Sequence, residues 1–297
     1  MAGTPGGTLH LVATPIGNLE DVTLRALRVL REAALVLAED TRRTRILLDR
    51  HGIAARPRSL HAHNEAARTA EVLAALAAGR DVALVSDAGT PLVSDPGERL
   101  VAAAIAAGHP VVPVPGPSAV LAALAGSGLP PVPFAFLGFA PRRAAERAAR
   151  FAPFRGRPET LVLFESPHRL AATLRALAEA LGPRPACVAR ELTKLHEEWA
   201  RATLPALAER FAGGTRGELT IVVGGAPPGG VEGRSASGGA HGASPNEPDG
   251  APRLGPRIAA MRRAGLGARE IAGVLAKELG CTRREAYALV HRHGDDA

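Results

Sequence analysis

The amino-acid sequence predicts an α/β protein with two α/β/α domains, followed by a small C-terminal helical unit on a flexible linker. Short apolar runs alternate with longer Ala-, Leu- and Arg-rich stretches over the first 225 residues, which is typical of α/β layers with mostly parallel sheets. The 297 residues suffice for two domains, and 46% hydrophobic residues exclude disorder throughout. After residue 223 the composition shifts to Gly, Ser and Pro.

The strand candidates are short apolar runs bounded by turn residues. They are residues 9–13, 34–38, 82–86, 111–114, 134–137, 160–164, 187–190 and 219–223. Apolar residues at helical spacing lie between them, at residues 23–31, 65–78, 98–107, 118–125 and 167–181. We place the first domain at residues 1–117 and the second at residues 118–225, and we interpret the Pro-rich residues 129–133 as a hinge between two α/β halves.

The C-terminal part of the chain divides into a linker and a helical segment. Residues 226–253 are rich in Gly, Ser and Pro, which predicts a flexible linker. Residues 254–297 regain helical patterning, with Thr282 and Glu285 spaced as in a capping box. The apolar residues expected in its core are Ile258, Met261, Ile271, Val274, Leu275, Leu279, Tyr287, Leu289 and Val290. With eight basic and five acidic residues, this unit is either an RNA-binding module or a packing or dimerisation appendage.

The charge balance narrows the classes of partner. The chain has 36 Lys and Arg residues against 29 Asp and Glu, a net charge of +7, and only Lys194 and Lys277 are lysines. Arginine offers a planar fork to phosphate and stacks on bases, so this composition favours a nucleic-acid partner. A genome that favours Arg codons would produce the same bias. The 3% aromatic content disfavours a base-stacking platform.

Simple counts exclude several other classes of protein. Cys187 and Cys281 are too few and too far apart for a disulfide framework. The apolar runs are too short to span a membrane, and residues 1–8 lack the pattern of a signal peptide. We therefore expect a cytoplasmic protein with no membrane segment.

Three loops that follow strand candidates are rich in Gly, Pro and small polar residues. They are residues 13–19, 86–97 and 113–119. Glycine lets the backbone approach a ligand and proline stiffens that approach, while Ser118 is expected to cap the next helix. Ligands of open α/β sheets bind beyond the carboxyl ends of strands. Neither a G-x-G-x-x-G fingerprint after a strand nor a P-loop is present, so we expect a nucleoside-like ligand held by backbone groups.

Several unusual strings stand in order along the chain. They are ATPIGNL at residues 13–19, AEDTR at 38–42, HNE at 63–65, VSDAGTP at 85–91, PGPSA at 115–119, FES at 164–166 and ARELTK at 189–194. Together they resemble the ribosomal RNA small-subunit methyltransferase I family, within the tetrapyrrole methylase superfamily. The resemblance covers about residues 8–225 and, more loosely, the C-terminal unit, whereas the long linker departs from the family pattern.

The resemblance implies an activity, a cofactor and an assembly. Proteins of this family use S-adenosylmethionine to methylate the ribose 2′-hydroxyl of a cytidine, cytidine 1402, in the decoding region of 16S rRNA in the small ribosomal subunit. The cofactor is expected in a cleft between the two α/β domains, and the assembly is expected to be a homodimer. Carried over to this chain, the cofactor contacts are Pro15, Asp87, Ala88, Gly89, Val93, Ser118, Ala119 and Phe164.

A ribose hydroxyl is a weak nucleophile, so a general base would assist the reaction. Lys194 is the first candidate, because a lysine in a part of the chain that otherwise uses only arginine suggests a titratable amine that burial could make basic at neutral pH. Its alternative role is an ion pair with Glu191 or Glu197. The other candidate bases are Asp40, Glu39 and Glu191, whose alternative roles are helix capping and ion pairing.

The expected RNA contacts are Arg42, Arg43, Arg45, His63 and Asn64. His61 and His63 are separated by one residue, so on a strand both side chains would point to the same face and could bind one cation. No cysteine or third ligand accompanies them, so no metal is expected. Two other functions remain open from the sequence. One is methylation of a porphyrin or corrin ring, and the other is a non-catalytic rRNA-binding factor with a vestigial cleft.

Overall fold

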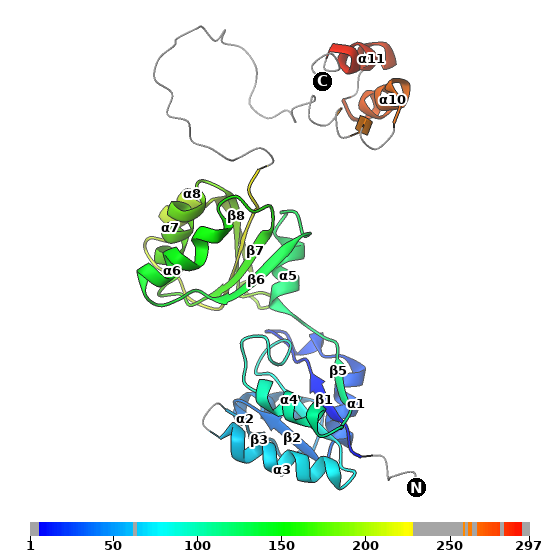
Figure 1. Ribbon diagram of the computed structural model, residues 1–297, viewed down its shortest axis with the longest axis vertical. Helices are drawn as coiled ribbons and strands as arrows, with labels where there is room; N and C mark the ends of the chain where they lie inside the picture. Colours follow the sequence, from blue (N-terminus) through cyan, green and yellow to red (C-terminus); the bar gives the residue numbers. More distant parts are fainter. Residues whose placement is uncertain are drawn as a thin grey trace. The chain divides into compact units, whose positions relative to one another are not determined.

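The computed structural model describes residues 6–61, 64–227, 258, 261–262, 266–279 and 282–292. The chain separates into two compact units, Met1–Gly233 and Arg234–Ala297, and each is described here by itself (Figure 1). The first unit contains two five-stranded sheets. None of the helices in the described ranges is long and apolar enough to cross a membrane.

The first sheet is entirely parallel, with strand order β3-β2-β4-β1-β5. Its strands are β1 (Leu9–Val12), β2 (Leu35–Ala38), β3 (Arg58–Ser59), β4 (Val82–Val85) and β5 (Val111–Val114). Its helices are η1 (Leu19–Asp21), α1 (Leu24–Glu32), α2 (Thr41–Arg50), α3 (Glu65–Ala77) and α4 (Glu98–Ala106). The four longer strands and helices α1, α3 and α4 confirm the sequence prediction. The two-residue strand β3 carries no apolar run and was not predicted.

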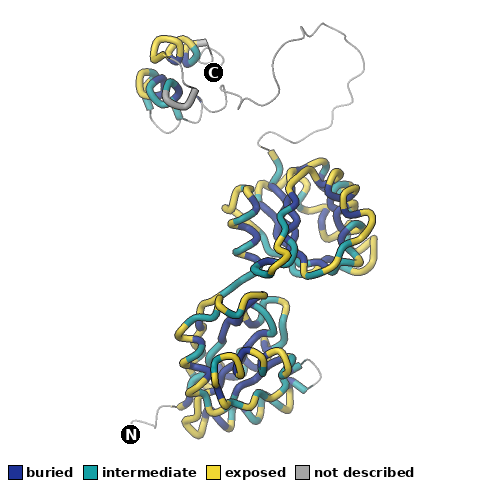
Figure 2. Tube along the Cα trace, turned by 180° about the vertical axis from the view of Figure 1, so that it is seen from behind, coloured by how far each residue is buried: buried dark blue, intermediate teal, exposed yellow. Residues whose placement is uncertain are grey.

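Helices cover both faces of this sheet, because successive side chains of a strand point to opposite faces. Val36 and Ala38 pack with residues of α1 and α2 in one buried cluster, whereas Leu37 packs with residues of α3 and α4 in another. Figure 2 shows the buried strands enclosed by more exposed helices. The carboxyl ends of the strands are left free to carry a site.

The second sheet has strand order β6-β7-β10-β8-β9. Its elements are α5 (Ala119–Gly126), β6 (Phe134–Phe139), α6 (Ala144–Phe151), η2 (Ala152–Phe154), β7 (Thr160–Glu165), α7 (Leu170–Leu181), β8 (Pro185–Arg190), β9 (Glu198–Thr203), α8 (Leu204–Arg210) and β10 (Leu219–Val223). Only β6 and β7 pair in parallel; β10 is antiparallel to both β7 and β8, and β8 to β9. The expectation of mostly parallel sheets is therefore wrong for this half, because the short segment between β8 and β9 reverses the chain.

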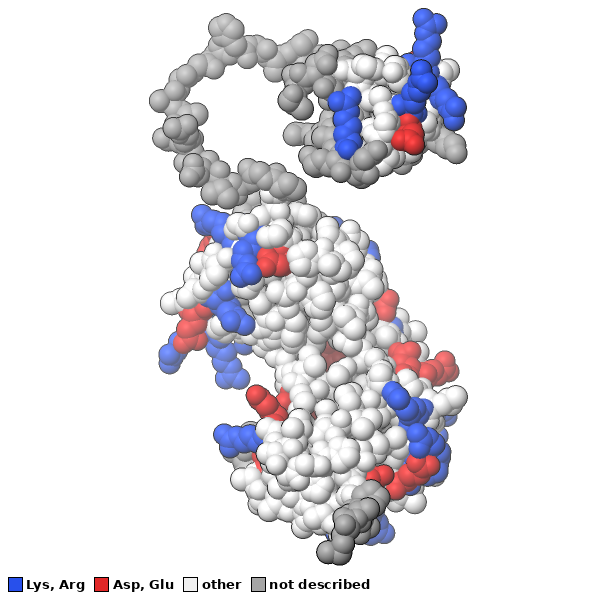
Figure 3. All heavy atoms as spheres, turned by 45° about the vertical axis from the view of Figure 1, so that its right-hand side comes forward, with Lys and Arg blue, Asp and Glu red and all other residues white. Residues whose placement is uncertain are grey.

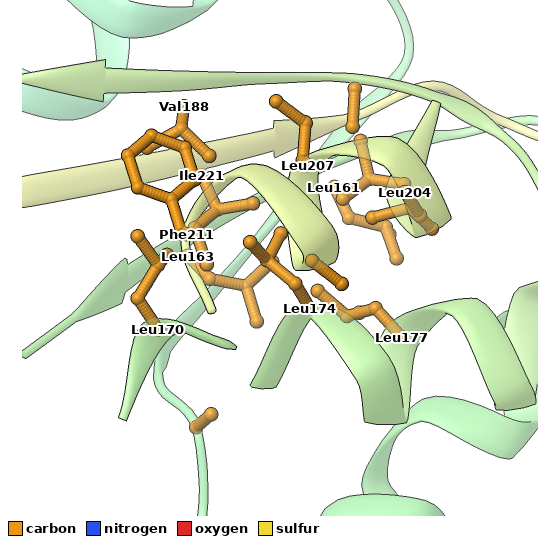
Figure 4. Packing of buried hydrophobic residues seen from close by; sticks show 14 of the residues in the cluster. Leu161, Leu163, Leu170, Leu174, Leu177, Val188, Leu204, Leu207, Phe211 and Ile221 are labelled. Atoms are coloured by element: carbon orange, nitrogen blue, oxygen red, sulfur yellow. The ribbon is translucent and has the colours of Figure 1, made fainter. Parts of the chain in front are cut away.

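The two faces of the second sheet pack against different partners. One face carries the core drawn in Figure 4, where leucines of α7 and α8 contact Leu161, Leu163 and Ile221 of the strands. The other face buries Val162 and Val222 against α5. That second cluster also includes Ile16, which comes from the loop after β1. An apolar contact therefore joins the loops of the first sheet to the face of the second.

Helix α5 belongs with the second sheet, against which it packs through β7 and β10. Residues 129–133 follow α5 and lead into β6, so they lie inside the second half and the hinge interpretation of this Pro-rich stretch is wrong. The segment between β5 and α5, which contains the boundary predicted at residues 117 and 118, connects the two sheets. The domain division itself stays a prediction.

The described part of the second unit contains α10 (Ala268–Leu279) and α11 (Arg283–Arg292). Its core contains Ile258, Ile271, Leu275 and Val290, as predicted, but Tyr287 is 38% exposed, so its placement in that core is wrong. The capping box is confirmed: Thr282 N–H donates to Glu285 Oε2 at 2.8 Å, and Glu285 N–H donates to Thr282 Oγ1 at 3.3 Å. The predicted linker lies outside the described residues except for its first two positions.

Candidate functional site

A pocket of about 380 Å³ lies where loops of the two sheets meet in the first unit. Glu39 follows β2 and Asp87 follows β4, while Glu165 ends β7 and Leu219 begins the antiparallel neighbour β10. The lining residues are Ile16, Glu39, Arg43, Asp87, Ala88, Val93, Ser94, Asp95, Ala119, Phe139, Phe164, Glu165, Ser166, Pro167, Ala189, Leu192, Gly217, Glu218, Leu219 and Thr220. The volume is in the range of small-molecule sites.

The cofactor residues inferred from the resemblance gather at this pocket. Five of them line it: Asp87, Ala88, Val93, Ala119 and Phe164. The other three shape the adjoining turns. Pro15 precedes the lining residue Ile16, Gly89 exchanges two backbone hydrogen bonds of 2.9 Å with Thr14, and the Ser118 hydroxyl accepts from Leu121 N–H at the start of α5.

Three carboxylates from the first half, Glu39, Asp87 and Asp95, line the pocket. Asp87 Oδ1 accepts from Asp40 N–H at 2.7 Å, and Asp95 is hydrogen-bonded to the Ser86 hydroxyl. Burial raises the pKa of Asp95 above its ordinary value; the Ser86 hydrogen bond opposes this and the charge of Asp87 adds to it. Burial and the charges of Asp87 and Asp95 likewise raise the pKa of Glu39, against the effects of His61 and Arg43. Because like charges crowd here, a cationic ligand would relieve their repulsion.

The second half contributes an aromatic wall. The Phe164 ring lies 4.9 Å from that of Phe136 and 5.6 Å from that of Phe139, measured between centroids. Gly138 has φ +67°, a conformation that glycine adopts without strain, and it coincides with a register irregularity in β6. This local turn places Phe139 at the pocket, with 56% of its surface exposed.

Glu165 lines the pocket, its side chain is fully buried, and both of its carboxylate oxygens accept hydrogen bonds. Its carboxylate accepts from Thr173 Oγ1 at 2.6 Å, from Ser166 N–H at 2.7 Å and from Arg169 Nη2 at 3.0 Å. Arg169 also donates to the carbonyl of Ala140, in the loop after β6. Glu165 therefore ties the start of α7 and the loop after β6 to the end of β7.

Lys194 does not meet the expectation of a neutral amine. Its Nζ donates to Glu191 Oε1 at 2.8 Å and to Glu218 Oε2 at 3.0 Å. Burial alone would lower the pKa of Lys194, but the hydrogen bonds and charges of these two carboxylates outweigh it and raise the pKa. The same contacts, led by the Lys194 hydrogen bond, lower the pKa of Glu191. The raised pKa keeps Lys194 protonated and so without a free lone pair, and the lowered pKa makes the Glu191 carboxylate a weaker base. Both effects suit an ion pair and disfavour either residue as the base.

A glycine next to this ion pair is structurally required. Gly217 has φ +94°, and a Cβ atom there would lie 2.6 Å from Cγ of Glu191. The close approach lets the Glu218 N–H donate to Glu191 Oε1 at 2.8 Å. Gly217 and Glu218 line the pocket, whereas Glu191 and Lys194 are not among its lining residues. The sequence pattern could not reveal this, because Glu218 lies far along the chain from Lys194.

Asp40 is also occupied by local contacts. Its carboxylate caps α2 by accepting from Arg42 N–H at 2.9 Å, and it pairs with the Arg42 guanidinium at 3.0 and 2.8 Å. The Arg42 side-chain hydrogen bonds, followed by the backbone bond, lower the pKa of Asp40 to about 2. A carboxylate with so low a pKa is a poor proton acceptor, and we withdraw Asp40 as the base.

Most of the residues expected to contact RNA have hydrogen-bond or ion-pair partners within the protein. Arg42 pairs with Asp40, and Arg45 donates to the Ala55 carbonyl at 3.2 Å and lies 3.6 Å from Asp49. Asn64 accepts from His61 N–H at 2.9 Å and donates to the Ser59 carbonyl at 3.1 Å. Arg43 alone of these residues lines the pocket. His63 lies outside the described residues, and within the described ranges no three His, Cys, Asp or Glu side chains are grouped to hold a metal ion.

Sequence reasoning missed several lining residues. Asp95 stood inside the predicted loop 86–97 and Glu165 inside a quoted motif, so proximity to those signals could have found both. Phe139 and Thr220 had no such signal, since each is an apolar or small residue of a strand. Glu39 was named only as an alternative base.

Comparison with known proteins agrees with this geometry. The model of the Tetrapyrrole (Corrin/Porphyrin) Methylases matches residues 8–208. A ribosomal RNA small subunit methyltransferase I of Micromonospora olivasterospora is 52% identical over 223 residues, 74% of this chain and 71% of that protein. The Mesorhizobium japonicum protein of the same name is 48% identical over 73% of this chain and 74% of its own length.

Solved structures show the same fold. Uroporphyrin-III C-methyltransferase of Thermus thermophilus, in complex with S-adenyl homocysteine, is 25% identical with a TM-score of 0.52 and covers 73% of this chain and 97% of that one. Another crystal structure of the Thermus thermophilus enzyme is 27% identical with a TM-score of 0.54, covering 73% and 94%. The chain therefore belongs to the tetrapyrrole methylases, and within them to the ribosomal RNA small subunit methyltransferase I family.

Proposed function

We propose that this protein transfers a methyl group from S-adenosylmethionine to the 2′-hydroxyl of a cytidine ribose in the decoding region of 16S rRNA. The observation that carries the proposal is the pocket between the two sheets, lined by five of the eight residues that the resemblance assigns to the methyl donor. The names of the similar proteins direct the choice of substrate toward small-subunit rRNA. The net charge of +7 fits a polyanionic substrate.

The residues of the pocket fit the methyl donor chemically. Ile16, Val93 and Phe164 supply apolar and aromatic surface for a nucleoside. The carboxylates of Asp87 and Asp95 supply negative charge for a sulfonium cation. Burial and the charge of Asp87 raise the pKa of Asp95, so a nearby cation would stabilise its ionised form. When bound, S-adenosylmethionine supplies an electrophilic methyl group.

Glu39 is the pocket carboxylate best suited to accept the proton of the ribose hydroxyl. It lines the pocket, and its pKa is raised whereas that of Asp40 is lowered to about 2. A higher pKa makes the carboxylate a stronger base. Asp95 is less available because its carboxylate is hydrogen-bonded to Ser86. We therefore assign the proton-accepting role to Glu39 in place of Lys194, Glu191 and Asp40.

A methyl-transfer assay tests the function. The protein is incubated with labelled S-adenosylmethionine and small ribosomal subunits from a strain that lacks this activity. We expect one methyl group per subunit, located on a cytidine ribose by mass spectrometry of nuclease fragments. Methylation of a base contradicts the proposal. A protein that leaves the rRNA unmodified and methylates a porphyrin or corrin ring supports the ring-methylase alternative, and one that binds rRNA without binding the donor supports the vestigial-cleft alternative.

The C-terminal unit offers a surface suited to RNA. Arg283 and Arg284 are exposed at the start of α11, and the exposed Tyr287 ring lies 4.7 Å from the His291 ring. Basic side chains are prominent on the described surface of this unit (Figure 3). An auxiliary role in RNA binding stays a prediction, as do the homodimer and the cytoplasmic location that were expected from the sequence.

A further inference from the structure

Exposed arginines lie in or next to the segments that line the pocket. Arg43 lines the pocket itself, and Arg216 directly precedes the lining residue Gly217. Arg142 and Arg143 follow the lining residue Phe139 after two intervening residues. All four arginines are exposed. We call these four residues the arginine rim. Basic residues thus lie in or beside three lining segments of a pocket that is also lined by Glu39, Asp87 and Asp95.

The rim arginines have few strong partners within the protein. On the face shown in Figure 3, basic and acidic side chains mostly lie beside one another, and many arginines of the first unit have short ion pairs or carbonyl partners. In contrast, the side chains of Arg142 and Arg216 have no hydrogen bond or ion pair with any residue that the structure describes. Arg143 is 3.3 Å from the half-exposed Glu146, and Arg43 is 3.8 Å from the half-exposed Glu218. Exposed pairs of this kind are readily exchanged for another anion.

The loop that carries Arg142 and Arg143 is held in place by other arginines. Arg147 donates to the carbonyls of Pro141 at 3.2 Å and Arg142 at 2.7 Å. Arg169 donates to the Ala140 carbonyl and is itself held by Glu165 on the pocket wall. The backbone is therefore fixed relative to the pocket while two guanidinium groups are left exposed. A fixed backbone of this kind suits phosphate binding by the two arginines, because little loop entropy is lost when the ligand binds.

We propose that the arginine rim binds the phosphates that flank the target ribose, so that the RNA backbone crosses the pocket mouth. The inference rests on the proposed function and adds the residues that grip the substrate, which are mainly in the second half of the unit. A single-stranded segment is the fitting occupant, because a ribose can enter a pocket only from an unpaired, splayed strand. The half-exposed Phe139 at the mouth supplies apolar surface for the neighbouring sugar or base.

The test compares three full-length variants with the wild type. The test variant is Arg142→Ala/Arg143→Ala, and Arg142→Lys/Arg143→Lys retains the charge. The control Arg150→Ala/Arg175→Ala removes two exposed arginines that do not line the pocket. The ligands are a single-stranded RNA oligonucleotide, small ribosomal subunits and S-adenosylmethionine. Affinities are measured at several salt concentrations, because each phosphate contact with a single strand contributes about 0.7 to the slope of log K against log salt.

We expect the test variant to bind the oligonucleotide at least about tenfold more weakly than the control, with a salt slope reduced by about 1.4. The lysine variant should recover most of the affinity, and the S-adenosylmethionine affinity should change less than about twofold. Equal RNA affinity of test variant and control would overturn the inference and leave the proposed function intact. A loss seen with ribosomal subunits but not with the oligonucleotide would also overturn it, by pointing to a ribosomal protein. If the wild type neither binds nor methylates RNA, the proposed function itself fails.

Discussion

The two halves of the first unit build one pocket with opposite chemistry. The first half contributes carboxylates, and at Glu39 and Asp95 burial and like charges raise the pKa values. The second half contributes the aromatic wall, three of the four rim arginines and two carboxylates, Glu165 and Glu218. Glu165 is the buried one of the two, and its partners all lie within hydrogen-bond distance. Unbalanced charge is typical of a group kept for a ligand, and a satisfied charge is typical of a group kept for the fold. Burial alone therefore does not distinguish a carboxylate that binds a ligand from one that stabilises the fold.

The largest effect is expected when Glu165 is replaced. Glu165→Ala leaves the Thr173 hydroxyl and the Arg169 guanidinium without their acceptor, and breaking a buried charged network of this kind costs about 3–5 kcal/mol. Urea unfolding of the variant should show this loss in the free energy of unfolding. Glu146→Ala, at an exposed position of α6, is the control and should change it by less than about 0.5 kcal/mol. A loss below about 1 kcal/mol for Glu165→Ala would remove the contrast between the two halves.

Replacement of Glu39 should affect the reaction more than the fold. Glu39→Gln retains the shape but cannot accept a proton, so kcat should fall at least about 100-fold, while the dissociation constants for S-adenosylmethionine and RNA stay within about threefold. In the wild type, kcat should decline as the pH falls through the raised pKa of Glu39, because the base must be ionised. The variant should lack this decline. An unchanged kcat would show that the hydroxyl proton goes elsewhere.

The same substitution has a smaller effect on stability, and its sign follows from the raised pKa. Because the folded state favours the protonated carboxyl, the contribution of Glu39 to stability is present at low pH and is lost as the pH rises through the pKa of the folded protein. Glu39→Gln should therefore be more stable relative to the wild type at pH 8 than at pH 4. Parallel urea titrations at the two pH values measure this difference. The opposite order would contradict the raised pKa.

Replacement of Asp87 tests the negative charge of the pocket, and its expected effect on donor binding is more moderate. Asp87→Asn keeps an oxygen that can accept from Asp40 N–H but removes a negative charge from the pocket. The dissociation constant for S-adenosylmethionine should rise about tenfold, which corresponds to about 1.4 kcal/mol. The neutral product S-adenosylhomocysteine, which lacks the sulfonium charge, should lose less. Equal losses for the two compounds would mean that Asp87 acts through a hydrogen bond and not through its charge.

The sequence predicted the first half better than the second for a physical reason. Parallel strands buried on both faces are near-continuous apolar runs, so β2 and β4 were evident, as was β1, which is interrupted only by His10. The edge strand β9 exposes three of its six residues, buries only one and has no such run. It was therefore missed, together with the antiparallel order that it completes. The loops at the site were predicted because Gly and Pro mark tight turns regardless of tertiary context.

Charge states could not be predicted in the same way. Whether Lys194 is a base depends on Glu218, which reaches it only through the turn at Gly217. Arg42 and Arg43 are neighbours in sequence, yet the first is paired with Asp40 and the second lines the pocket. The sequence shows which groups can titrate or bind a ligand. Their partners in the folded protein determine which of those groups do so.

We assign different ligands to two groups of charged residues: the carboxylates of the first half attract the positive charge of the donor, and the rim arginines, mainly of the second half, bind RNA. Equilibrium titration of Asp87→Asn and of Arg142→Ala/Arg143→Ala, each with S-adenosylmethionine and with the RNA oligonucleotide, tests that assignment most directly. The account predicts crossed losses: the first variant binds the donor weakly and RNA normally, and the second binds RNA weakly and the donor normally. Two variants that each weaken both ligands, or neither, would contradict it.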